Sequence, residues 1–166
     1  MAEILCFSRN RFTGVEQVDE ATIRSTCRVQ DTVIEAWVEI LVRLPNLEIT
    51  GARGEIRRSR DGGGSDLAAG LSRLTGSRVG PGIKKIVRGL LEDLPHLEQV
   101  VALVDECATG VIMSFTRDVL AQAPRGAAGE KEFFAAMVRA NPRLYDSCAA
   151  LAPDSPLMDG VRPGET

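Results

Sequence analysis

The sequence has little histidine and no clustered cysteine. His96 is the single histidine among 166 residues, and the four cysteines, Cys6, Cys27, Cys107 and Cys148, stand far apart in the chain. No Cys-x-x-Cys pair occurs, which excludes the zinc-knuckle and dithiol redox motifs. The sequence also holds no motif for an organic cofactor, so we expect neither a protein-bound metal nor a cofactor.

A basic field and a long apolar run are missing as well. The formal net charge is −3, whereas nucleic-acid partners usually require a basic surface. No stretch of about 18 apolar residues is present, so the sequence predicts no transmembrane helix. The first residues lack a basic segment followed by an apolar one, the pattern of a secretory signal. We therefore expect a cytoplasmic protein with reduced thiols and with neither a nucleic-acid nor a membrane partner.

What is present is the composition of an ordinary globular protein, with 44% apolar and 26% charged residues. A period of two predicts strands over residues 23–29 and 33–43, and further strands are expected over 4–15 and 47–58. In 33–43 one face is wholly apolar, with Ile34, Ala36, Val38, Ile40 and Val42. Short connections between the strands indicate an antiparallel meander.

After residue 65 the apolar spacing becomes helical and predicts helices over 66–74, 83–92, 96–122 and 130–140. Strands followed by helices are typical of an α+β fold. We expect an N-terminal antiparallel β-meander of three to four strands packed against C-terminal helices. A single domain is expected over 1–151. The tail over 152–166 holds three prolines and two glycines and is expected to be mobile.

His96 opens the longest predicted helix. Its imidazole has an ordinary pKa of roughly 6.5, which makes it the first candidate for general acid–base catalysis. On a helix it shares a face with Gln99, Leu103 and Glu106. The alternative is a structural residue at a helix start.

Two carboxylates could work with His96 as further catalytic residues. Asp31 precedes the central strand and Glu39 lies within it, and either would orient the imidazole or carry a second proton. Glu39 shares a strand face with Glu35 and Trp37, and Trp37 is a candidate for substrate contact. The competing hypothesis is an ordinary solvated face, with the glutamates paired across strands to Arg24, Arg28, Arg53 or Arg57.

Two arginines near the start, Arg9 and Arg11, point to the same side of the first predicted strand. Guanidinium groups at this spacing suit a carboxylate or a phosphate, so both are candidates for binding an anionic group of the substrate. The alternative is a charged edge strand that opposes aggregation.

Five short segments resemble an uncharacterised bacterial family, a domain of unknown function. They are Phe7-Ser8-Arg9-Asn10-Arg11, Asp31-Thr32 before a central strand, the Leu47-Glu48-Ile49 strand that leads to arginines, the segment from Gly80 to Gly89, and His96-Leu97 at the start of a long helix. The resemblance covers about residues 7–150. It implies a small α+β protein often encoded among catabolic genes, and it implies no defined reaction.

The chain departs from that family in two places. Arg57-Arg58-Ser59-Arg60 has no cysteine where the relatives carry one, and Leu94-Pro95 stands where a Cys-Thr pair would precede the histidine. The resemblance therefore implies no cysteine-dependent chemistry for this chain, and Arg9, Asp31 and His96 are the positions that match.

These observations favour a small cofactor-independent enzyme of the lyase or isomerase type. It would transfer protons on a small organic catabolic substrate, with aromatic and acyl compounds as the candidate classes. The alternative is a non-catalytic module that binds a small ligand or assembles, with a homodimer joined through the sheet or the long helix. A third hypothesis is a metal-dependent protein that uses His96 with carboxylates.

Overall fold

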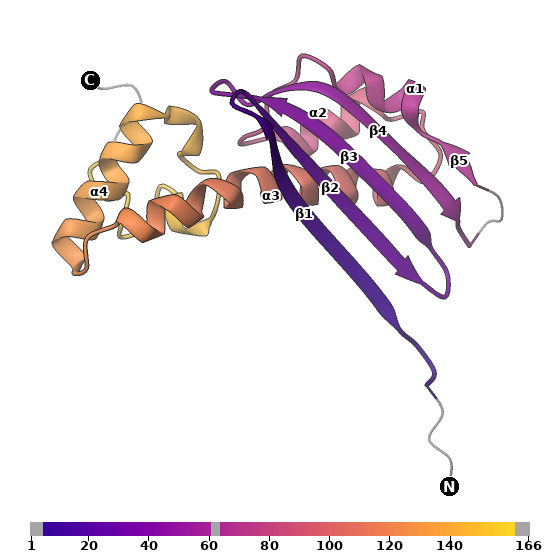
Figure 1. The fold of residues 1–166 in the computed structure, drawn as a ribbon, viewed down its shortest axis with the longest axis horizontal. Helices are drawn as coiled ribbons and strands as arrows, with labels where there is room; N and C mark the ends of the chain where they lie inside the picture. The colour runs from indigo at the N-terminus through magenta and orange to yellow at the C-terminus, as the bar shows by residue number, and fades with distance from the viewer. Residues whose placement is uncertain (1–4, 61–63, 162–166) are drawn as a thin grey trace, which may run out of the picture. The chain divides into compact units, whose positions relative to one another are not determined.

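The computed structural model describes residues 5–60 and 64–161 (Figure 1). The chain divides into two compact units, Met1–Val111 and Ile112–Thr166. The first unit contains the sheet, and the long helix α3 begins in the first unit and ends in the second. The division into one domain over 1–151 and a tail over 152–166 stays a prediction.

Five antiparallel strands form a sheet in the order in which they occur in the chain. They are β1 (Arg9–Asp19), β2 (Thr22–Asp31), β3 (Glu35–Arg43), β4 (Glu48–Arg58) and β5 (Ser65–Asp66). The α+β fold with an N-terminal meander is thereby confirmed. The first strand runs from residue 9 to residue 19, whereas the sequence predicts 4–15.

The two-residue strand β5 is an addition to the predicted meander. Ser65 and Asp66 pair with Ile56 and Glu55 of β4, at the position where the sequence predicts the start of a helix. The Asp66 carboxylate accepts the Ala68 amide at 2.8 Å, so this aspartate ends the strand pairing and begins the helical turn.

Helices make up most of the remaining described chain. They are α1 (Ala68–Leu71), α2 (Ile83–Leu90), α3 (Leu97–Gln122) and α4 (Ala127–Ala140), with 3₁₀ turns at Ser72–Leu74, Pro142–Leu144 and Ala149–Leu151. No helix within 5–60 and 64–161 is both long and apolar enough to span a bilayer.

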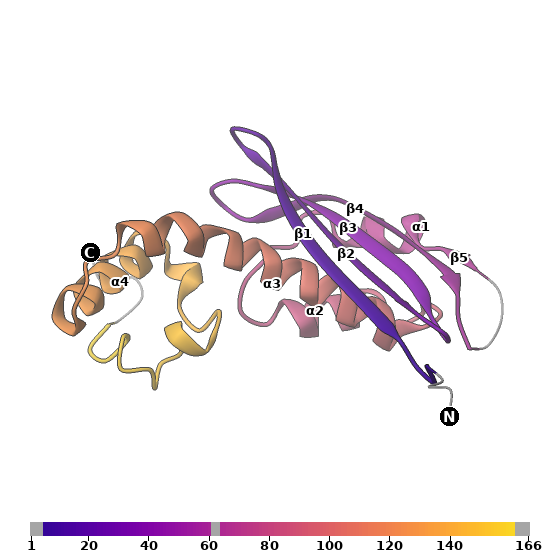
Figure 2. The same cartoon turned by 60° about the horizontal axis from the view of Figure 1, so that its bottom comes forward.

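The core of the first unit lies between the sheet and the helices (Figure 2). On β3, the residues Ala36, Val38, Ile40 and Val42 are fully buried, which confirms the predicted apolar face. We call this side of the sheet the inner face and the opposite side the outer face. Alternation along the strand therefore places Trp37 and Glu39 on the outer face.

The part of α3 that belongs to the first unit lies against the inner face. Ser25 donates a hydrogen bond to the Cys107 carbonyl at 2.9 Å, and the Cys107 thiol lies 3.5 Å from the Val38 carbonyl. A Cβ at Gly110 would lie 3.1 Å from methyl groups of Thr13 and Val15. The absence of a side chain at Gly110 thus permits the close approach of α3 to β1 and β2.

The second unit is built from the end of α3, α4 and the turns that follow. Its buried side chains include Ala135, Val138, Leu144 and Leu151. Met158 and Val161, from the segment that the sequence assigns to a tail, are also buried.

Candidate functional site

A cleft of about 230 Å³ lies on the inner face, between the start of α3 and the end of the sheet where β1 begins and β2 ends. Its lining comes from β1, β2, the β2–β3 turn and the first turns of α3. These residues are Arg9, Arg11, Val29, Ile34, Glu98, Gln99, Ala102 and Leu103.

The cleft has an apolar floor and a charged rim. Val29 and Leu103 are buried, while the side chains of Arg9 and Arg11 are 54% and 51% exposed. This separation follows from the strand register, because Arg11 pairs with Val29 and both point to the inner face. A site of this kind suits a small ligand that has an apolar body and one charged end.

Asp31 organises the turn beside the cleft. Its carboxylate is fully buried, and one oxygen accepts the amides of Val33 and Ile34, each at 2.7 Å. The other oxygen accepts Arg9 Nε at 2.8 Å. The two backbone hydrogen bonds, followed by the bond from Arg9, hold the pKa of Asp31 below its usual value of 3.8. Asp31 is therefore ionised at neutral pH and fixes the β2–β3 turn.

Arg9 is held in place by the fold, with its guanidinium between Asp31 and an aromatic ring. Its Cζ lies 5.4 Å from the centroid of the Phe7 ring, within the range of a cation–π contact. Because an arginine has five N–H donors, the contact through Nε leaves the terminal nitrogens for other acceptors.

Arg11 lies near a carboxylate of α3. Its Nη1 is 3.7 Å from Glu106 Oε2, and the Thr13 hydroxyl donates to Glu106 Oε1 at 3.3 Å. Both charged side chains are partly exposed, so water screens their attraction. A ligand anion at the cleft would compete with Glu106 for Arg11 at little cost.

His96 immediately precedes α3 and has an uncommon backbone conformation. Its φ of 57° lies in the left-handed region, which histidine enters more readily than most residues. Its carbonyl accepts the amides of Gln99 and Val100 at 3.0 and 3.1 Å, so its backbone begins the helix. The side chain is half-buried and does not line the cleft.

Glu39 and Trp37 lie on the outer face, away from the cleft. Glu39 accepts Arg53 Nε at 2.8 Å and lies 3.8 Å from Arg24 Nε. The Arg53 guanidinium stands over the Trp37 ring, 5.9 Å from its centroid. Glu39 thus takes part in the cross-strand pairing that the sequence offers as the competing hypothesis.

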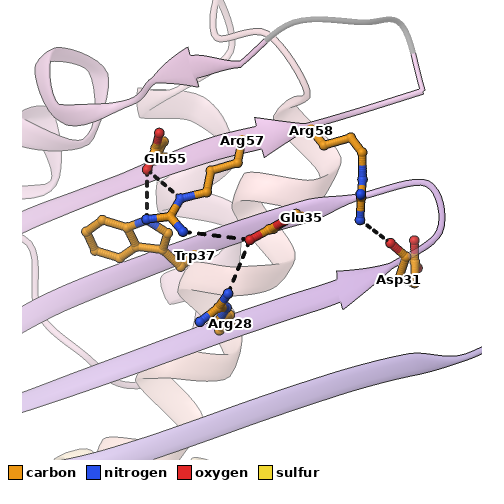
Figure 3. Close-up of polar contacts among 7 residues, drawn as sticks. All are labelled: Arg28, Asp31, Glu35, Trp37, Glu55, Arg57 and Arg58. Atoms are coloured by element: carbon orange, nitrogen blue, oxygen red, sulfur yellow. Dashed lines mark hydrogen bonds and ion pairs between the residues drawn. The ribbon is translucent and has the colours of Figure 1, made fainter.

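The same pattern continues along the outer face (Figure 3). Glu35 lies between Arg28 and Arg57, at 3.2 and 3.7 Å. Glu55 accepts Arg57 Nε at 3.0 Å and Trp37 Nε1 at 3.3 Å. The Arg57 bond, followed by the indole bond, lowers the pKa of Glu55. Opposite charges alternate across three strands, so this network stabilises the sheet.

The structure brings together some of the predicted site residues and separates others. Arg9, Arg11 and Asp31 meet on the inner face at one end of the sheet, whereas Glu39 and Trp37 lie on the outer face. Their catalytic and binding roles stay predictions. The alternation over 23–31 indicates this division. Asp31 lies two residues after Val29 and four after Cys27, both of which are buried, so Asp31 belongs to the inner face.

The face of α3 that sequence reasoning groups with His96 is the one that meets β1. Gln99 and Leu103 line the cleft, and Glu106 lies beside Arg11. Four further lining residues, Val29, Ile34, Glu98 and Ala102, are not among the site residues that the sequence predicts. Ile34 belongs to the apolar series of 33–43, but only the turn at Asp31 brings it to the end of the sheet.

Comparisons with known proteins add no relative. No family model matches the chain, and no curated protein or solved structure matches it either. The resemblance to a domain of unknown function therefore stays a prediction. In the described part of the chain, no group of three or more His, Cys, Asp or Glu side chains is placed to hold a metal ion.

Proposed function

We propose that the inner-face cleft binds a small amphipathic carboxylate, and that the protein acts as a non-catalytic ligand-binding module. The observation that carries the proposal is the pairing of an apolar floor with two arginines at the rim. The volume of about 230 Å³ lies below the roughly 300–1,000 Å³ typical of pockets for drug-sized molecules. The ligand would therefore be a compact acid, such as an aromatic carboxylate or a short acyl chain.

The binding mode follows from the chemistry of the lining. The carboxylate of the ligand would accept hydrogen bonds from the terminal nitrogens of Arg9 and from Arg11, in the bidentate manner that guanidinium groups favour. The apolar body would lie against Val29, Ile34 and Leu103. Asp31 would act through Arg9, because it holds the guanidinium at the rim.

Binding can be measured by isothermal titration calorimetry with sodium benzoate and sodium hexanoate as probes. Substitution Arg11→Gln should weaken binding roughly 10- to 100-fold, since a hydrogen bond to a charged group contributes about 1.5–3 kcal/mol. Arg53→Gln is the matched control, because Arg53 is also exposed and paired with a glutamate but lies on the outer face. Its affinity for benzoate should be unchanged.

A second readout locates the probe. In ¹³C-methyl spectra, benzoate should shift the signals of Val29, Ile34 and Leu103, which line the cleft. Benzamide, which has the same ring without the charge, should bind more weakly than benzoate. The proposal fails if neither probe shifts these methyl signals, or if Arg11→Gln and Arg53→Gln weaken binding equally.

The cofactor-independent lyase or isomerase is the second candidate function. The observation in its favour is the left-handed backbone of His96, because uncommon backbone conformations cluster at functional sites. Its imidazole would have to reach a ligand seated beside Gln99. Turnover of a bound carboxylate that His96→Gln abolishes, with unchanged binding, would support this function over simple binding. Cytoplasmic location stays a prediction in either case.

A further inference from the structure

The inner-face cleft carries a carboxylate as well as the two arginines of its rim. Glu98, in the first turn of α3, is one of its lining residues, and Gln99 is another. The Glu98 side chain is 69% exposed, and its Oε2 accepts a hydrogen bond from Arg88 Nη2 at 2.6 Å. Since a carboxylate has about four acceptor sites on its two oxygens, this bond orients Glu98 and leaves it able to accept from a ligand.

The packing of α3 on β1 explains why charges of both signs reach one cleft. Gly110 lies against Thr13, and Glu106, one turn earlier in the helix, lies beside Arg11. A helical turn advances about 5.4 Å and two strand residues advance about 6.6 Å, so the helix and the strand run in step in the same direction. The first two turns of α3 therefore lie along the start of β1, where Arg9 stands.

The charges of the lining are balanced. Three of the lining residues are charged, and each has a partner of the opposite sign on the protein. The pairs are Arg9 with Asp31, Arg11 with Glu106, and Glu98 with Arg88. These groups together leave no net charge, so a ligand that bears both signs matches this lining better than a simple anion does.

We propose that the cleft binds an α-amino acid with an apolar side chain, an inference that deepens the proposed function and rests on it. The carboxylate of the amino acid accepts hydrogen bonds from Arg9 and Arg11, as a simple carboxylate would. Its ammonium group donates to the Glu98 carboxylate and to the side-chain oxygen of Gln99. Its apolar side chain lies against the floor of the cleft.

The position of the charges specifies an α-amino acid and not an acid with a distant amino group. The charged lining residues have exposed side chains at the rim, whereas Val29 and Leu103 of the floor are buried. An ammonium group at the far end of the apolar chain would have to enter the floor, where an unpaired charge is costly to bury. Carboxylate and ammonium must therefore be attached close together at one end of the ligand.

Three acids with the same carbon chain separate these alternatives in isothermal titration calorimetry of the full chain at neutral pH. Hexanoate has the carboxylate alone, L-norleucine adds an α-ammonium group, and 6-aminohexanoate carries the ammonium group at the far end. L-Norleucine should bind roughly tenfold more tightly than hexanoate, since hydrogen bonds between charged groups are among the strongest. 6-Aminohexanoate should bind more weakly than hexanoate.

The substitution Glu98→Gln tests the carboxylate that binds the ammonium group. It should weaken the binding of L-norleucine roughly tenfold. It should tighten the binding of hexanoate, because it removes a negative charge from the cleft and releases Arg88 from its ion pair. Glu16→Gln is the matched control, because Glu16 is also exposed and paired with an arginine but lies on the outer face. It should change the affinity for neither ligand.

The outcomes distinguish the amino acid from the simpler carboxylate. The amino acid is excluded, and carboxylate binding stands, if hexanoate binds and L-norleucine binds no more tightly. Equal effects of Glu98→Gln and Glu16→Gln on the affinity for L-norleucine exclude it as well. If hexanoate, benzoate and L-norleucine all fail to bind, the proposed function is overturned together with this inference.

Discussion

Asp31 shows how one carboxylate can serve the turn and the cleft together. It is buried, it accepts two backbone amides from the turn that follows β2, and it holds Arg9 at the rim of the cleft. The Arg58 guanidinium also donates to the Asp31 carbonyl, at 2.5 Å (Figure 3). Asp31, which the sequence offers as a proton carrier, is ionised, and its carboxylate accepts three hydrogen bonds, which favours a structural role.

The pH dependence of stability follows from this placement. The folded-state pKa of Asp31 lies below the usual 3.8, so the ionised form stabilises the fold at pH values above the usual pKa. That stabilisation is lost as the pH falls through the lowered pKa. We expect Asp31→Asn to lower the free energy of unfolding at pH 7, and the difference from wild type to shrink below about pH 4.

Urea denaturation at several pH values measures this difference. Glu92→Gln, which alters an exposed carboxylate of the same unit, serves as the control and should show little difference at any pH. An ionic role for Asp31 would be contradicted if the free energy of unfolding of Asp31→Asn stays below that of wild type by the same amount down to the lowest pH measured.

At the scale of elements, β4 shows why one glycine of a strand is required and another is not. A Cβ at Gly54 would lie 2.6 Å from the backbone oxygen of Trp37 and 3.1 Å from Leu71 Cδ1. A Cβ at Gly51 would meet only the Leu41 side chain, with Cδ1 at 3.6 Å and Cβ at 4.0 Å, which are ordinary contacts. Gly54 therefore lets β3 and α1 approach β4 closely. In the sequence it is only a glycine within a predicted strand, a pattern that indicates a bulge or a close backbone approach.

We expect Gly54→Ala to lower the free energy of unfolding by about 1–3 kcal/mol, the usual cost of overpacking a core. Gly51→Ala should change it by less than about 1 kcal/mol, because the methyl group finds space and the unfolded chain loses freedom. Chemical denaturation of both variants gives the comparison. Equal losses in the free energy of unfolding at the two positions would show that crowding against the backbone at Gly54 does not cause the loss.

For the whole molecule, burial divides the four cysteines into two pairs. Cys27 and Cys107 are buried in the core of the first unit, Cys6 is exposed and Cys148 is half-exposed. Burial raises the pKa of Cys107 to about 12 and also raises that of Cys27. Since the thiolate is the reactive form, the core thiols should be inert while the protein is folded.

Titration with an aromatic disulfide reagent at mildly alkaline pH tests this division. The folded protein should expose two reactive thiols, and all four should react after unfolding in guanidinium. The double substitution Cys6→Ser with Cys148→Ser should abolish the reaction of the folded protein. Residual reaction of that variant before unfolding would show that the core opens on the timescale of labelling.

The sequence by itself determined the strand and helix periods. The apolar face of β3, the four main strands and the α3 face shared by Gln99, Leu103 and Glu106 follow from alternation and from helical spacing. These are local properties, because neighbouring side chains must point in directions fixed by the backbone. The same rule places Asp31 and Glu39 on opposite faces of the sheet, because Asp31 continues the buried series of β2 and Glu39 belongs to the partly exposed series of β3.

Only the tertiary structure decided which of these faces meet. The contact between Thr13 and Glu106 joins residues 93 positions apart, and it depends on the β1–β2 register and on the close approach of α3 at Gly110. Packing of a whole layer sets such distances, and no short segment encodes them. The cleft beneath Arg9 and Arg11, and the separation of Trp37 from it, therefore arise from how the sheet and α3 fit together.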